Sequence, residues 1–130
     1  MKFTPIAEHH LYDKAFKRGA RFVGRYISVH VLRDYAAKHR MLAHPMKIYT
    51  NRIGLSVTKR IGGAVQRNRA KRIIRAALRA VEASTPIKTG YLVVISARPT
   101  IAGKTSVDIE KELRYCFRKL DMLAKEDSTK

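Results

Sequence analysis

Between residues 62 and 81, apolar side chains recur every three or four positions, the period of a helix that buries one face. The apolar stripe consists of Ala70, Ile73, Ile74, Ala77, Leu78 and Val81. The other half of the helix carries Arg67, Asn68, Arg69, Lys71, Arg72, Arg75 and Arg79, without an acidic residue among them. We predict a helix that ends near Ser84, packs its stripe on the core and presents its basic half to a polyanion or to bulk water.

Two stretches alternate between apolar and polar side chains, as expected for strands with one buried face. Residues 22–32 place Ile27, Val29 and Val31 on one face and Tyr26, Ser28 and His30 on the other. Residues 53–59 oppose Ile53, Leu55 and Val57 to Gly54, Ser56 and Thr58. The two polar faces could form the floor of a channel beside the basic helix, or they could simply face solvent.

A short helix is predicted over residues 8–18, with a glycine directly after it. Leu11 and Ala15 lie one turn apart on this helix, and so do Tyr12 and Phe16. All four side chains could belong to the core. Alternatively, the two aromatic rings line a groove in which unpaired bases stack.

The C-terminal part should contribute a strand and a helix. Residues 91–97 form a continuous apolar run, which indicates a strand that is covered on both faces. Thr105 and Asp108 have the spacing of a capping box at the start of a helix. The apolar stripe of that helix is Ile109, Leu113, Cys116, Phe117, Leu120 and Leu123.

The predicted order is helix, three strands, helix, strand, helix, where the second strand is expected at residues 46–50 after Pro45. Residues 34–42 could be a short helix or an exposed excursion. We therefore expect an α/β (α+β) two-layer fold with one mixed four-stranded sheet and with the helices packed on its apolar face. The 130 residues should form a single domain whose core spans about residues 8–123.

Charge narrows the possible partners. The chain has 28 Lys and Arg against 10 Asp and Glu, a net charge of +18. No acidic residue lies between Asp34 and Glu82, a span that holds 12 of the Lys and Arg residues. Self-repulsion on this scale favours an anionic partner, which we expect to be nucleic acid, with a membrane surface as a distant second.

The turn before the basic helix could also bind phosphate. Lys59 and Arg60 precede Gly62 and Gly63, and paired glycines allow positive φ and a close approach of the backbone to a ligand. Backbone N–H groups at a helix N-terminus bind anions. Asn68 could contact a base edge or a sugar.

The residues needed for catalysis by the protein itself are scarce. The basic region has no carboxylate to hold a metal, and His9 and His10 would diverge by about 100° on a helix. We therefore expect no catalytic or metal site in this chain. The N-terminus lacks the apolar core of a signal peptide and no run is long enough to span a bilayer, so a cytoplasmic protein is expected.

Residues 52–79, RIGLSVTKRIGGAVQRNRAKRIIRAALR, resemble the signature region of the bacterial ribonuclease P protein subunit. The core of this signature falls on Arg67, Asn68, Arg69, Lys71, Arg72 and Arg75. Agreement extends outward through YDKAFKRG, YLVVISARP and LRYCFRKL, so that the resemblance covers roughly residues 11–120.

The resemblance implies a left-handed βαβ crossover, against the usual hand. It also implies a ribonucleoprotein that removes the 5′ leader from precursor tRNA, in which the RNA subunit holds the catalytic Mg²⁺ and the protein needs no cofactor of its own. The residues expected to bind the RNA subunit are Lys59, Arg60, Arg67, Asn68, Arg69, Lys71, Arg72, Arg75 and Arg79. The residues expected to bind the single-stranded leader, in a cleft between the sheet and the N-terminal helix, are Tyr12, Phe16, Tyr26, Ser28, His30, Ser56 and Thr58.

His30 takes a strand position at which some relatives place an aromatic ring, and Tyr26, on the same face by alternation, is the expected substitute. Two rival hypotheses remain at this point. One is a ribosomal-type protein or general RNA chaperone of similar fold, and the other is a nuclease that acts without an RNA subunit.

Overall fold

The computed structural model describes residues 4–6, 9–34, 51–84, 87–88 and 90–123. Its strands are β1 (Thr4–Pro5), β2 (Ala20–Val23), β3 (Ile27–Arg33), β4 (Arg52–Ser56) and β5 (Tyr91–Ala97). Its α-helices are α1 (His9–Arg18), α3 (Ala64–Ser84) and α4 (Ser106–Lys119), and two short 3-10 helices are η1 (Lys59–Ile61) and η2 (Pro99–Ile101). The strand expected at residues 46–50 and the undecided segment at residues 35–42 lie outside the described residues.

The sheet has the strand order β1-β4-β5-β3-β2, with β5 at its centre. β5 is parallel to β4 and antiparallel to β3, so the sheet is mixed, as predicted. The four longer strands and the three α-helices follow the predicted order along the chain, and the two-residue β1 adds to the edge beside β4. α3 connects the neighbouring parallel strands β4 and β5, and the left hand of this crossover stays a prediction from the resemblance.

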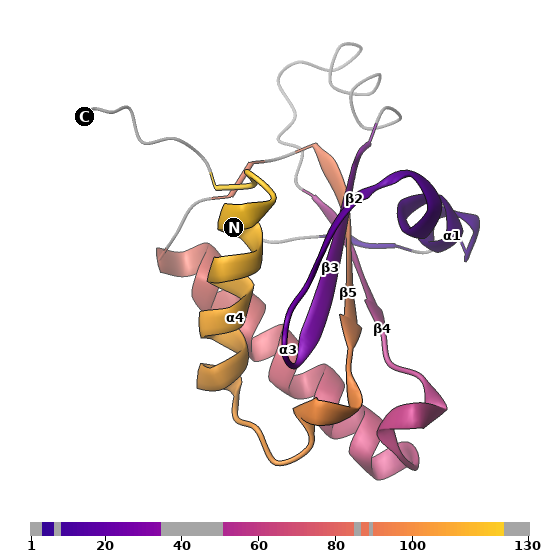
Figure 1. Cartoon of the computed structure of the whole chain (residues 1–130), viewed down its shortest axis with the longest axis vertical. Coiled ribbons are helices and arrows are strands. Elements are labelled where there is room, and N and C mark those ends of the chain that lie inside the picture. The colour runs from indigo at the N-terminus through magenta and orange to yellow at the C-terminus, as the bar shows by residue number, and fades with distance from the viewer. Residues whose placement is uncertain (1–3, 7–8, 35–50, 85–86, 89, 124–130) are drawn as a thin grey trace.

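The helices lie on both sides of the sheet, α3 and α4 on one side and α1 on the other (Figure 1). The larger core cluster packs β3, β4 and β5 against α3 and α4. The smaller cluster joins Leu11 and Ala15 of α1 to Leu92 and Val94 of β5. The prediction that all helices pack on one face is therefore wrong for α1. Alternation along β5 explains the two clusters, because Val93 and Ile95 face α3 and α4 while Leu92 and Val94 face α1.

Residues 20–33 form a hairpin, and the prediction of one strand over residues 22–32 is wrong in this respect. β2 and β3 are antiparallel, with Arg21 opposite His30 and Val23 opposite Ser28. Residues 24–26 form the turn between them. Alternation within β3 is as predicted, because Ile27, Val29 and Val31 are buried in the larger core.

A carboxylate from α4 holds this turn. Glu112 accepts hydrogen bonds from the backbone N–H groups of Arg25 at 3.0 Å, Tyr26 at 2.7 Å and Ile27 at 2.8 Å. Three backbone donors that no strand partner satisfies are thereby paired. The contact also joins the hairpin to the helix layer, across more than 80 residues of sequence.

The predicted features of α4 are present. Thr105 caps the helix and forms the capping box with Asp108. Ile109, Leu113 and Cys116 are fully buried. Burial, and to a lesser extent the neighbouring Glu112 carboxylate, raises the pKa of the Cys116 thiol to about 12. Cys116 is thus a core residue, as the sequence pattern indicated.

Candidate nucleic-acid interface

α3 has the two predicted faces. Ala70, Ile74, Ala77, Leu78 and Val81 are buried, and Ile73 packs against the same core while half-buried. The polar residues on the other side differ in exposure. Asn68, Arg72, Arg75 and Arg79 are exposed, whereas Arg67, Arg69 and Lys71 are half-buried. Glu82, in the last turn of α3, is the helix's single acidic residue, and no acidic residue lies among the cations from Arg67 to Arg79.

Arg69 differs from the other cations of α3. Its guanidinium donates a hydrogen bond of 3.0 Å to the backbone carbonyl of Lys104, in the loop between η2 and α4. This contact ties the first turns of α3 to the start of α4. Arg69 therefore stabilises the fold and also contributes to the positive charge of the surface.

The turn before α3 is a short 3-10 helix. η1 carries Lys59 and Arg60, both exposed, and Thr58 accepts a hydrogen bond from the backbone N–H of Arg60 as its N-cap. Gly62 then adopts φ 139°, which side-chain-bearing residues rarely adopt. The positive φ predicted for the paired glycines is thus confirmed for Gly62.

Register places three serines side by side on the sheet face that α1 partly covers. Ser28 of β3 lies opposite Ser96 of β5, and Ser96 lies opposite Ser56 of β4. Directly paired residues of neighbouring strands point to the same face, and the strands are about 4.8 Å apart. The next row along the strands consists of Arg21, His30, Val94 and Gly54.

Tyr12 lies on Gly54. A methyl group added at Gly54 would come within 2.5 Å of the Tyr12 ring, so the ring occupies the space above that backbone. Tyr12 is half-buried and packs against the smaller core cluster. Tyr12 therefore fits the interpretation as a core residue, because its ring packs on the sheet. Phe16 is 39% exposed and is the ring that is free to stack on a base.

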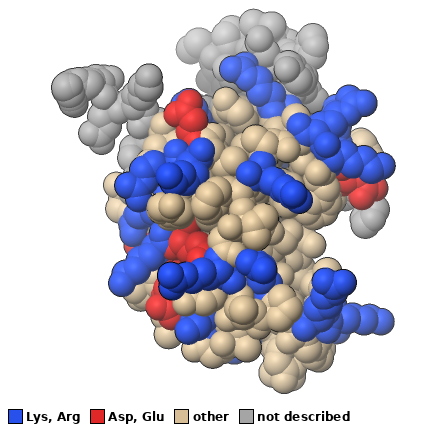
Figure 2. All heavy atoms as spheres, in the orientation of Figure 1, with Lys and Arg blue, Asp and Glu red and all other residues tan. Residues whose placement is uncertain are grey.

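Phe16 lies at the edge of the part of this sheet face that α1 leaves open. Its ring meets His30 edge to face, with 4.8 Å between centroids and an interplanar angle of 85°. We call the surface formed by Phe16, His30, Ser28, Ser96 and Ser56 the α1 groove. Figure 2 shows the outline of the molecule hollowed between α1 and η1, with Lys and Arg side chains on both sides.

The far end of the α1 groove is polar and basic. An open hollow there has Ser56, Ser96, Lys59, Arg60, Arg98 and Thr58 in its lining. The groove thus runs from the aromatic ring of Phe16, over three hydroxyl groups, to the cations that precede α3. Aromatic rings and cations along one path are what a single-stranded nucleic acid binds.

His30 is buried in this surface, and the Nδ1 atom of its ring has no hydrogen-bond partner among the described residues. Burial, and next the positive charge of Arg21, lower the pKa of His30 below its ordinary value. The ring is therefore neutral under physiological conditions. A neutral imidazole can stack and accept a hydrogen bond, but it adds no charge to the groove.

This lowered pKa predicts a pH dependence of stability. As pH falls from about 7 to about 5, the unfolded chain takes up a proton on His30 before the folded chain does, so the free energy of unfolding should decrease. His30→Phe keeps an aromatic ring and should remove this part of the decrease. Urea denaturation of both proteins over that pH range measures the difference, in which the other histidines cancel. The prediction would be contradicted if the free energy of unfolding decreased equally in both proteins over this pH range.

Of two further residues expected in the leader cleft, Tyr26 lies elsewhere and Thr58 lies only at its end. Tyr26 belongs to the turn before β3, packs against the larger core, and has the ammonium group of Lys104 at 5.0 Å from its ring centroid. The prediction that Tyr26 shares the face of His30 is therefore wrong, because alternation begins only at Ile27. Thr58 lies beyond the end of β4 and caps η1, although it still lines the end of the groove.

Ser96 is a groove residue that the sequence pattern did not reveal. It belongs to the apolar run of β5, which indicated only burial. The signal that could have found it is its parity, because Leu92, Val94 and Ser96 share one face of the strand.

Among the described residues, no group of three or more His, Cys, Asp and Glu could hold a metal ion. No described helix is long and apolar enough to cross a membrane.

Comparison with known proteins gives consistent results. The family model described as Ribonuclease P matches residues 2–121. The protein of Clostridioides difficile named "Ribonuclease P protein component" is 30% identical over 111 residues, 85% of this chain and 86% of the relative. The protein of the same name from Bacillus velezensis is 34% identical over 118 residues, 90% of this chain and 89% of the relative.

Solved structures show the same fold. The Staphylococcus aureus RNase P protein superposes with a TM-score of 0.72 at 21% identity, over 95% of this chain and 100% of that chain. The RNase P protein of Thermotoga maritima superposes with a TM-score of 0.61 at 19% identity, over 80% of this chain and 86% of that chain.

Proposed function

Because this chain belongs to the ribonuclease P protein family, we propose that it assists a catalytic RNA in removing the 5′ leader from precursor tRNA. In this proposal the basic half of α3, together with η1, binds the RNA subunit. The α1 groove holds the single-stranded leader. The RNA subunit holds the Mg²⁺ ions that carry out the cleavage, and the protein contributes binding and charge.

The observation that supports this proposal most directly is the continuity of the two surfaces. Lys59 and Arg60 line the end of the α1 groove and also precede α3 in the chain. A leader that lies in the groove would therefore leave it beside the RNA bound by α3. Cations at that junction lower the repulsion between the two RNAs, so that less Mg²⁺ is needed to hold them together.

Removing a cation of α3 should flatten the salt dependence of RNA binding. We expect Arg67→Ala to lower the affinity for the RNA subunit and to reduce the slope of log K against log salt by roughly 0.7–0.9 for each phosphate that is no longer neutralised. Arg69→Ala should do the same and should also lower thermal stability, because it removes the hydrogen bond to Lys104. Filter binding over a series of salt concentrations measures the slope.

Arg114→Ala is the matched control for this measurement. It removes the same charge from α4, where Arg114 forms an ion pair of 2.5 Å with Glu110. Its slope should stay at the wild-type value. An unchanged slope for Arg67→Ala as well would remove α3 from the RNA interface.

Reconstitution tests the function as a whole. A precursor tRNA is incubated at low Mg²⁺ with a bacterial ribonuclease P RNA, with this protein, or with both. Correct 5′ processing only in the mixture is the expected result. Cleavage by the protein without RNA would instead support the independent nuclease. Tight binding of both RNAs without processing, even with RNA from a close relative, would favour the general RNA chaperone.

A further inference from the structure

A second group of aromatic rings and cations lies on the other side of the sheet, between α4 and the β2–β3 hairpin. We call it the α4–β2 face. Its rings are the exposed Tyr115 and the half-buried Phe22 and Tyr26, and its cations are Arg25, Lys104, Lys111, Arg118 and Lys119. The rings of Phe22 and Tyr115 meet edge to face at 5.5 Å, and they border an open hollow of ≈ 700 Å³.

Tyr115 is placed for contact with a ligand. It is 44% exposed, whereas the next residue, Cys116, is fully buried, so the ring is on the outer side of α4. Arg118 and Lys119 carry their charges 5.7 and 5.4 Å from the centroid of this ring. The core does not need the exposed part of this ring, which remains in contact with water in the isolated chain.

The charge of the α4–β2 face is positive, although two carboxylates line its hollow. Glu112 is engaged by three backbone N–H groups of the turn, and Asp108 by the backbone and hydroxyl groups of Thr105. Arg25, Lys111 and Arg118 form no ion pair with a carboxylate among the residues that the structure describes. Figure 2 shows Lys and Arg side chains spread over this side of the molecule.

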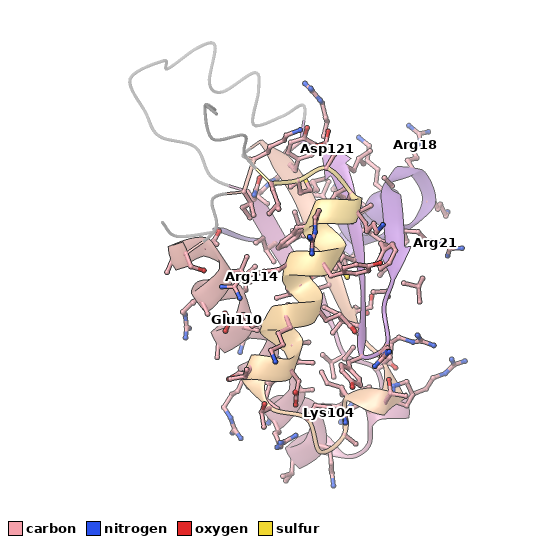
Figure 3. The ribbon with its side chains drawn as sticks, turned by 60° about the vertical axis from the view of Figure 1, so that its left-hand side comes forward. Arg18, Arg21, Lys104, Glu110, Arg114 and Asp121 are labelled. Atoms are coloured by element: carbon pink, nitrogen blue, oxygen red, sulfur yellow. The ribbon has the colours of Figure 1, made fainter. Side chains whose placement is uncertain are left out.

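This face is separate from the α1 groove. Phe22 pairs with Val29, whose side chain is buried between the sheet and the helices α3 and α4, and Phe22 packs against that same core. The α1 groove lies on the opposite side of the sheet. In Figure 3, α4 lies in front of the sheet, with Glu110 and Arg114 toward α3 and with Arg18 and Arg21 on the far side of β2. One extended strand in the α1 groove cannot also lie along α4.

We propose that the α4–β2 face is a second binding site for single-stranded RNA. Unpaired bases stack on exposed aromatic rings, and cations around those rings bind the phosphates between the bases. Both requirements are met by Tyr115 with Phe22 and by Arg25, Lys111 and Arg118. An acidic peptide would use the cations but would leave the exposed ring of Tyr115 without a function, so RNA is the better match. This inference does not depend on what the α1 groove binds.

Native mass spectrometry tests the proposal by counting the copies of a short oligouridylate bound to the full-length protein. We expect two copies on the wild type and one on Tyr115→Ala. Tyr115→Phe keeps the ring and should bind two. Phe16→Ala removes the exposed ring of the α1 groove and should also bind one, whereas Phe16→Ala combined with Tyr115→Ala should bind none. The copies are counted at a salt concentration that releases RNA bound by the cations of α3 alone.

The failures of the two sites can be told apart. Two copies on Tyr115→Ala would overturn the α4–β2 site, whatever happens at the α1 groove. Two copies on Phe16→Ala, with one on Tyr115→Ala, would uphold the α4–β2 site and count against the α1 groove. If Tyr115→Ala does not fold, as judged by circular dichroism, Arg118→Ala and Lys111→Ala should each lower the affinity of the second copy about tenfold, because each removes one cation that binds the RNA. A polyglutamate peptide that binds in a Tyr115-dependent manner, where oligouridylate does not, would assign the face to a protein partner and overturn the proposal.

Discussion

Replacing Glu112 with alanine should lower the free energy of unfolding by about 3–5 kcal/mol, a large part of the ~5–15 kcal/mol that stabilises a typical domain. The carboxylate accepts three backbone hydrogen bonds of 2.7–3.0 Å in the β2–β3 turn. Alanine would leave the N–H groups of Tyr26 and Ile27 without an acceptor in a partly buried place. It would also detach the hairpin from α4. Chemical denaturation monitored by circular dichroism measures the decrease.

Glu110→Ala is the control for this prediction, since it removes the same charge from the same helix two residues away. Glu110 forms an i, i+4 ion pair with Arg114, and such surface pairs contribute little, about 0.3–0.5 kcal/mol. Glu112→Gln keeps one acceptor oxygen and should lie between the two variants. If Glu110→Ala and Glu112→Ala cost the same, the backbone contacts of Glu112 do not hold the turn.

Replacing Phe16 with alanine should weaken the binding of precursor tRNA relative to mature tRNA by about 1–3 kcal/mol, or roughly fivefold to 150-fold in affinity. The reason is the removal of the exposed ring at the edge of the α1 groove, where the proposed leader would stack a base. Mature tRNA has no leader, so its binding should change little. The two affinities are measured on the assembled ribonucleoprotein at one salt concentration.

Phe16→Trp is the matched control, because it keeps an aromatic surface at the same site and should retain the preference for precursor tRNA. Phe16 is a better choice than Tyr12, whose ring packs on Gly54 and whose removal would disturb the contact between α1 and the sheet. Equal decreases for precursor and mature tRNA in Phe16→Ala would mean that the α1 groove does not hold the leader.

The elements that can be predicted well are those whose evidence is local in sequence. The apolar stripe of α3 repeats with the helical period over several turns, and the helix ends at Ser84, as expected. The limits of β5 at residues 91 and 97 agree with the prediction, because its apolar run stands between Gly90 and the Arg98–Pro99 pair. The capping box of α4 depends on two residues three positions apart. Short-range physical chemistry determines each of these features.

The β2–β3 hairpin escapes prediction because its residues satisfy the alternation of a strand on both sides of the turn. Gly24 and Arg25 interrupt the apolar pattern only briefly, so the pattern is also compatible with one strand. As a consequence Tyr26 is assigned to the wrong face. A turn shifts the parity of the pattern, so an error in its position transfers a side chain from one surface of the sheet to the other.

The remaining errors concern contacts between distant parts of the chain. Glu112 holds a turn more than 80 residues away, and no local pattern shows that a carboxylate on α4 would find three free N–H groups there. Similarly, Ser28, Ser56 and Ser96 come together only through the register of three strands. Of the residues expected to bind the leader, Phe16, Ser28, His30 and Ser56 lie on one surface, as predicted. The parity of β5 gives the face of Ser96, but only the strand order places it between Ser28 and Ser56.

The central position of β5 has a consequence for the order in which the chain can fold during its synthesis. β3 and β4 do not pair with each other, and each is joined to the sheet through β5. The sheet therefore closes only after β5 has emerged from the ribosome, and the arginine-rich α3, which precedes β5 in the chain, emerges before it. Until then only the β2–β3 hairpin can form from near neighbours, and the apolar side of α3 has no completed sheet on which to pack. For this interval α3, the most basic segment of the chain, has left the ribosome without the complete sheet that later buries its apolar side.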